Sequence, residues 1–149
     1  MSRVIEWFLR VVGAAITTGI AAVFAQQQSS ARAPGESLWP FPGIVLLEIA
    51  VLGLIVLVAV ALDSAEHARH WGMLTWAVVG ALVSLMFLGI FSVGPFLFPA
   101  VLVFSVAAVL ADRRRGRGSA SNLGLAAITM VANGVLLIVL ISLTRAQDH

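Results

Sequence analysis

One carboxylate stands inside an otherwise apolar run of the chain. Glu48 is the sixth residue of the run 43–62, which places it ~8 Å below the start of a helix there. A charged carboxylate facing lipid is costly, so this side chain must face protein or water, or be protonated. Asn133 and Ser105, in later apolar runs, are candidate partners by composition alone. Two interpretations stay open: an ion- or proton-binding site formed by Glu48 and Asn133, or a structural carboxyl that reaches lipid headgroups or a neighbouring helix.

A second set of chemistry-bearing residues follows that run. Asp63, Glu66, His67 and His70 have the spacing i, i+3, i+4, i+7, which puts them on one face of a continuing helix. Carboxylates and imidazoles at this spacing are metal ligands in helical proteins. One helix seldom completes such a site, and the remaining histidine, His149, lies at the predicted opposite side of the membrane. We therefore expect no metal ion and no cofactor, and these four residues are only the weakest metal candidates.

Arginines gather in a third place. Arg113, Arg114, Arg115 and Arg117 lie in the predicted inner basic loop at residues 112–122. Such clusters mark the cytoplasmic side of membrane proteins, which is the simplest interpretation here. They also attract anionic lipid headgroups, by about 1 kcal/mol for each arginine near the surface. Headgroup binding and the docking of a partner protein are the alternatives.

Missing residue types exclude several chemistries. The chain has no cysteine, lysine or tyrosine, and its nine basic residues are all arginine. Thiol nucleophiles, iron–sulfur clusters, phosphate-loop lysines and Schiff bases are therefore excluded. The high sequence pI reflects the missing lysine and tyrosine rather than a basic nucleic-acid-binding face. No hydrolase or metalloprotease motif occurs, so we expect neither enzymatic activity nor nucleic-acid binding.

Five apolar runs must position these residues. Of the 149 residues, 60% are hydrophobic and only 11% are charged, whereas a soluble domain has ~25% charged residues. About 20 apolar residues in a helix cross a bilayer core, and the strict alternation of a transmembrane barrel strand is missing. The sequence therefore predicts an all-α, polytopic transmembrane helical bundle forming a single membrane domain. Its five spans are predicted at residues 4–25, 43–62, 73–91, 95–111 and 123–143.

The first run has two interpretations. Its length suits a signal peptide cleaved after Ala25, which would leave four spans. Trp7 lengthens the apolar run, and Glu6 weakens its positive start. Both features favour an uncleaved helix, with Arg10 snorkelling to the interface and an outer loop at residues 26–42.

Arginine counts orient the spans. With the N-terminus inside, the inner segments hold seven arginines and the outer segments hold two. The positive-inside rule then predicts a multi-pass protein of the cell membrane with a cytoplasmic N-terminus and an outside C-terminus.

Small and weakly polar residues recur at helical spacing in three predicted spans. They are Gly13 and Thr17, Gly80 and Ser84, and the series Asn122, Ala126, Thr129 and Asn133. Such stripes let membrane helices approach closely and form hydrogen bonds. We therefore predict a small non-enzymatic membrane protein, an accessory or structural component that packs with itself or with other membrane proteins. The alternative is a small transporter or proton-coupled carrier that uses Glu48.

Overall fold

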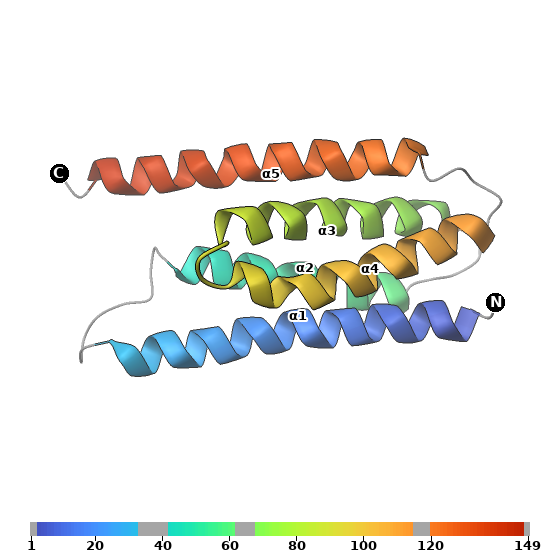
Figure 1. Ribbon diagram of the computed structural model, residues 1–149, viewed down its shortest axis with the longest axis horizontal. Coiled ribbons are helices and arrows are strands. Elements are labelled where there is room, and N and C mark those ends of the chain that lie inside the picture. Colours follow the sequence, from blue (N-terminus) through green and yellow to red (C-terminus); the bar gives the residue numbers. More distant parts are fainter. Residues whose placement is uncertain (1–2, 33–41, 62–67, 115–119, 148–149) are drawn as a thin grey trace.

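The computed structural model describes residues 3–32, 42–61, 68–114 and 120–147, and within them it contains α-helices and no strand. The helices are α1 (Arg3–Ala31), α2 (Gly43–Ala61), α3 (Ala68–Leu88), α4 (Gly94–Arg114) and α5 (Ala120–Gln147). They lie side by side, with α1, α3 and α5 running in one direction and α2 and α4 in the other (Figure 1). The predicted all-α bundle is confirmed.

Four helices, α1, α2, α4 and α5, are long and apolar enough to cross a membrane. The apolar part of α3 is shorter than the predicted 73–91 and covers Met73–Leu88. It ends there because the chain turns: the backbone N–H groups of Ser92 and Gly94 both donate to the Gly89 carbonyl, at 2.8 and 2.7 Å. A side chain at Gly94 would overlap the Met86 carbonyl, so the tightness of this turn requires glycine.

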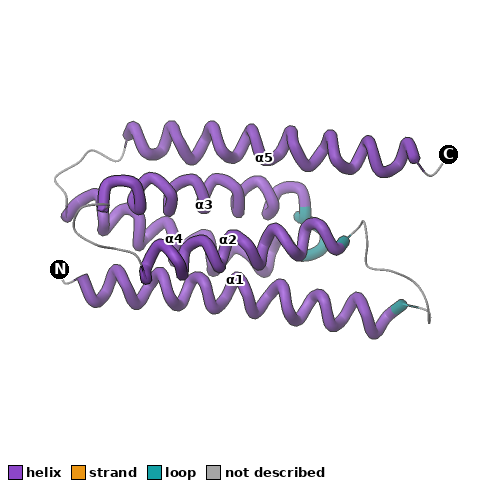
Figure 2. The backbone as a smooth tube through the Cα atoms, turned by 180° about the vertical axis from the view of Figure 1, so that it is seen from behind, coloured by secondary structure: helices purple, strands orange, loops and turns teal. Residues whose placement is uncertain are grey.

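Helices α1 to α4 form the core of the bundle, and α5 is added to one side. Among the described residues, α1 packs against α2 and α4, and α3 packs against α2 and α4. Phe104, Leu82 and Leu97 are wholly buried in this core. Helix α5 packs closely against α3 alone, and views from the front and from behind both place it at the edge (Figures 1 and 2).

Small residues set the closest helix approaches. Gly13 of α1 lies against the ring of Phe104, where an added Cβ would come within 2.6 Å of the ring. A Cβ at Gly80 of α3 would overlap the Ala126 carbonyl and the Thr129 hydroxyl of α5. The stripe of small residues predicted on the fifth span therefore faces α3, which is the contact that attaches α5.

The structure differs from the prediction at two helix ends. Helix α1 continues to Ala31, inside the predicted outer loop at 26–42. The hydroxyls of Ser29 and Ser30 donate to the Gln26 carbonyl at 2.8 and 2.9 Å, and no proline interrupts the helix before Pro34. Similarly, α4 includes Asp112 to Arg114, so the predicted inner loop begins as helix.

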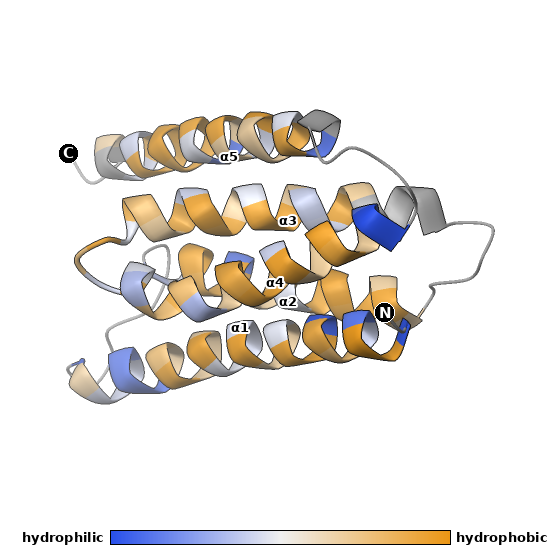
Figure 3. Cartoon of the chain, turned by 45° about the vertical axis from the view of Figure 1, so that its right-hand side comes forward, coloured by the Kyte–Doolittle hydropathy of each residue, from blue (hydrophilic) through white to orange (hydrophobic). Residues whose placement is uncertain are grey.

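The outer surface of the bundle is apolar along most of its length. Figure 3 shows hydrophobic residues over the middle of the helices and hydrophilic residues at the start of α1 and the end of α4. Ile128, Val131 and Val135 on α5 each expose more than half of their surface. Exposing such a continuous apolar surface to water is unfavourable, whereas contact with lipid is not.

Candidate functional site

The described residues contain two polar regions. The first, here called the basic end, is where α1, α3 and α5 begin and α4 ends. It comprises Glu6, Arg10, Trp76, Asp112, Arg114 and Asn122. The second lies within the spans, where Glu48 of α2 approaches Asn133 of α5.

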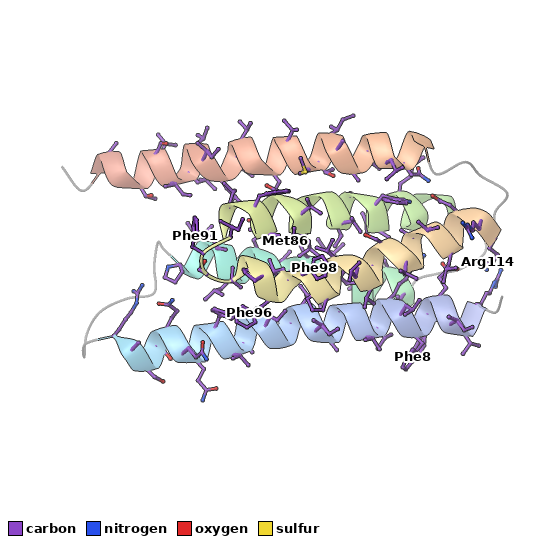
Figure 4. The ribbon with its side chains drawn as sticks, viewed as in Figure 1. Phe8, Met86, Phe91, Phe96, Phe98 and Arg114 are labelled. Atoms are coloured by element: carbon purple, nitrogen blue, oxygen red, sulfur yellow. The ribbon has the colours of Figure 1, made fainter. Side chains whose placement is uncertain are left out.

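Glu6 joins α1 to α4 at the basic end. Its carboxylate accepts a hydrogen bond from Arg10 Nη2 at 2.6 Å, one turn further along α1. It also forms an ion pair with Arg114 Nη2 at 3.0 Å, and Figure 4 shows Arg114 at the end of α4 beside the start of α1. Arg10 is only 1% exposed. The prediction that Arg10 snorkels to the interface is therefore wrong, because a carboxylate one turn away pairs with it inside the protein.

Asp112 joins three helices at the same end. Its Oδ2 accepts a hydrogen bond from Trp76 Nε1 of α3 at 2.9 Å. Asn122 Nδ2 of α5 donates to both carboxylate oxygens, at 2.9 and 3.0 Å. All three side chains are buried, so this carboxylate is satisfied by neutral donors rather than by solvent. Asp112 thereby ties α5 to α4, although the two helices do not pack closely over the described residues.

Glu48 and Asn133 are brought within reach of each other by α2 and α5. The Asn133 side chain lies close enough to interact with the Glu48 carboxyl. Its Nδ2 is buried, yet no acceptor in the described chain meets it at ordinary hydrogen-bond distance and angle. The contact is therefore not a well-formed hydrogen bond, and it leaves lone pairs of the carboxyl for another donor. Ser105, the other candidate partner, lies on α4, which does not pack against α2 in the described residues.

A groove of about 360 Å³ runs beside this pair, between α2, α3 and α5. Its lining consists of Leu52 and Ile55 from α2, Leu74, Ala77, Val78 and Ala81 from α3, and Thr129, Ala132, Asn133 and Leu136 from α5. Glu48, Leu52 and Ile55 have the spacing i, i+4, i+7 and so share one face of α2. The groove opens widely at the side of the bundle. We call these residues, with Glu48, the Glu48 groove.

The other predicted site residues are only partly described. Asp63, Glu66 and His67 lie outside the described residues, as do Arg115 and Arg117, and His70 belongs to the first turn of α3. Arg113 is exposed on the last turn of α4. Within the part of the chain that the structure describes, no group of three or more histidines and acidic residues could hold a metal ion.

Comparison with known proteins gives no relative: no family model matches the chain, and no curated protein or solved structure matches it significantly.

Proposed function

We propose that the protein is a small non-enzymatic membrane protein that works by packing against itself or against other membrane proteins. The supporting observation is a second stripe of small residues, on the outward face of α1. Ala15, Gly19 and Ala22 are exposed there at spacings of four and three. A Cβ built at Gly19 meets no atom within 4 Å. Small residues that face outward allow a further helix to approach as closely as the helices inside this bundle do.

Crosslinking tests this packing directly, because the natural chain has no cysteine. Gly19→Cys carries a benzophenone maleimide, which crosslinks to whatever helix lies against the outward face of α1 in native membranes. Gly124→Cys is the matched control, since Gly124 also meets nothing within 4 Å but lies on α5. A crosslinked product specific to position 19 is expected, and its mass distinguishes a second copy from another protein. Equal labelling at both positions, without a defined product, would contradict the proposal.

We also propose that the basic end faces the cytoplasm of a cell and that the protein resides in the cell membrane. The support is the uneven distribution of arginine, with the exposed Arg113 at this end available to anionic headgroups. Single cysteines at Ser2 and Gln147 test the orientation with an impermeant maleimide. Gln147→Cys should react in intact cells and Ser2→Cys only after permeabilisation; the reverse pattern would overturn the orientation.

A proton-coupled carrier is the second candidate, and the contact between Glu48 and Asn133 favours it. An acidic side chain within a span is the usual place for a coupled proton. In proteoliposomes, Glu48→Gln should abolish a flux that depends on a pH gradient. Absence of flux for every ion and solute tested on the natural chain would remove this candidate and leave packing as the function.

A further inference from the structure

We propose that the Glu48 groove binds an amphipathic organic cation, with the positive group at the Glu48 carboxylate and the apolar body between α2, α3 and α5. This goes beyond the packing function and does not rest on it. It names a class of ligand for the alternative function, the proton-coupled carrier. Because a ligand can bind without being transported, an experiment that excludes transport does not exclude binding.

The size of the groove favours a small molecule over a protein segment. Its volume of about 360 Å³ falls within the ~300–1,000 Å³ that small-molecule sites occupy. A helix with its side chains is about 10–12 Å across and would not fit into it. A second cavity, of about 220 Å³ near Phe24 and Leu137, is smaller.

The charge of the groove favours a cation. The lining itself has no ionisable side chain, but the carboxyl of Glu48 interacts with Asn133 in the lining, and the described residues bring no charged partner to this carboxyl. Arg10 and Arg114 form ion pairs with Glu6, far along the bundle at the basic end. A carboxylate in apolar surroundings without a paired cation attracts one strongly, because the surrounding dielectric screens it little.

The groove also has neutral polar atoms, on Thr129 and Asn133. The Thr129 hydroxyl donates its hydrogen to the carbonyls of Leu125 and Ala126, at 2.9 and 3.0 Å, so its oxygen is left to accept. Asn133 contributes an amide oxygen as an acceptor, and its buried Nδ2 meets no acceptor in good hydrogen-bond geometry in the described chain. An ammonium group with N–H donors could bind both the carboxylate and these oxygens, and the negative charge of Glu48 disfavours an anion.

The position of the groove also suits a ligand dissolved in the membrane. It opens at the side of the bundle, and Ala132 on its α5 wall is exposed. A molecule with an apolar body and a positive charge partitions into the bilayer and can reach the groove sideways.

Calorimetric titration of the purified full chain in a neutral detergent tests the proposal, with tetraphenylphosphonium and a long-chain primary amine as probes. Saturable binding is expected, and Glu48→Gln should weaken it by about tenfold or more. A neutral tetraphenyl compound of the same shape should show no difference between the natural chain and Glu48→Gln. Equal affinity of both chains for the cations would overturn the proposal.

A matched pair of variants separates loss of the groove from loss of the fold. Ala132→Phe fills the groove without touching Glu48, and Ala127→Phe places the same side chain on an exposed part of α5 outside the groove lining. Binding should be lost in Ala132→Phe and retained in Ala127→Phe. Unchanged binding in Ala132→Phe would contradict the proposal. Native mass spectra would also contradict the proposal if Ala132→Phe lost a bound phospholipid that the natural chain carries, rather than losing either cation.

Discussion

Both polar regions of this bundle place a carboxylate among apolar helices, but they differ in how completely that carboxylate is hydrogen-bonded. At the basic end, Glu6 and Asp112 are buried, and each accepts short contacts from two residues that lie on two different helices. In the Glu48 groove, the carboxyl interacts with one neutral amide among the described residues, without a well-formed hydrogen bond from the amide nitrogen, and the groove is open at the side. Satisfied buried groups hold a structure together, whereas an incompletely satisfied one is available to a ligand.

We expect the basic end to determine the stability of the chain and the Glu48 groove to determine ligand binding. The basic end connects α1, α3, α4 and α5 through side chains, so changes there should cost folding free energy. A substitution in the Glu48 groove removes fewer hydrogen bonds and ion pairs. Changes there should therefore weaken ligand binding and leave the folding free energy nearly unchanged. Five predictions test the contrast, from the largest expected effect to the smallest.

Removal of residues 1–25 should have the largest effect, because it deletes half of the basic end and a helix of the core. Glu6 and Arg10 would be lost, and Phe104 would lose its contact with Gly13. We expect the chain isolated from membranes to contain peptides from residues 1–25 in mass spectra. A chain lacking them should aggregate in mild detergent. A folded mature protein that begins at Gln26 would show instead that the first run is a signal peptide.

Asp112→Ala should be the most damaging single substitution. Two buried donors, Trp76 Nε1 and Asn122 Nδ2, lose their acceptor. At about 1–3 kcal/mol for each unsatisfied group, we expect a loss of about 4 kcal/mol in the free energy of unfolding. Titration with a denaturing detergent measures it. Arg113→Ala, on the exposed neighbouring residue, should change the unfolding free energy by less than about 0.5 kcal/mol.

Glu6→Gln should come next, at about 2–3 kcal/mol. The buried Arg10 loses its carboxylate, while Arg114 is partly exposed and can turn to solvent. A double-mutant cycle with Arg114→Ala isolates the link between α1 and α4, and we expect it to show a positive coupling energy. If the two substitutions add without coupling, this ion pair contributes nothing to the connection.

Gly80→Ala should weaken the attachment of α5. The added Cβ would overlap backbone and side-chain atoms of Ala126 and Thr129, so α5 must move away, at about 1–3 kcal/mol. Gly124→Ala is the matched control, because its Cβ meets nothing and the change should be within about 1 kcal/mol. Equal unfolding free energies for the two variants would show that α5 does not depend on close approach to α3.

Glu48→Gln should have the smallest effect on stability, within about 1 kcal/mol in either direction. The only described partner is Asn133, and glutamine can still reach it. The same denaturing-detergent titration measures this change. A loss as large as that expected for Asp112→Ala would remove the distinction between the two regions and make Glu48 a structural residue.

The sequence predicts the helices well because an apolar run of about 20 residues has few other stable structures in lipid. It predicts helix ends less well. The end of α3 depends on a turn around Gly89, and the extension of α1 to Ala31 depends on helix formation outside the apolar run. Neither feature alters the hydropathy from which the spans were predicted.

The sites show a similar division. The spacing of Glu6 and Arg10 is readable as a helical pair, and Asn133 was named as a partner for Glu48 by composition. The contact of Asp112 with Trp76 and Asn122 was missed, since it depends on which helices are neighbours and on their register. Because Asp112 lies next to a run of arginines, the local sequence does not indicate that its side chain is buried.

Helix α5 follows the other four helices in the chain and, among the described residues, packs closely against α3 alone. The other four helices can therefore assemble before it leaves the ribosome, and α5 then docks onto a surface that already exists. Until it does, Asp112 can accept a hydrogen bond from Trp76 but lacks both bonds from Asn122. The docking of α5 thus completes the hydrogen bonding of Asp112, and this requirement favours one register of α5 against the other helices.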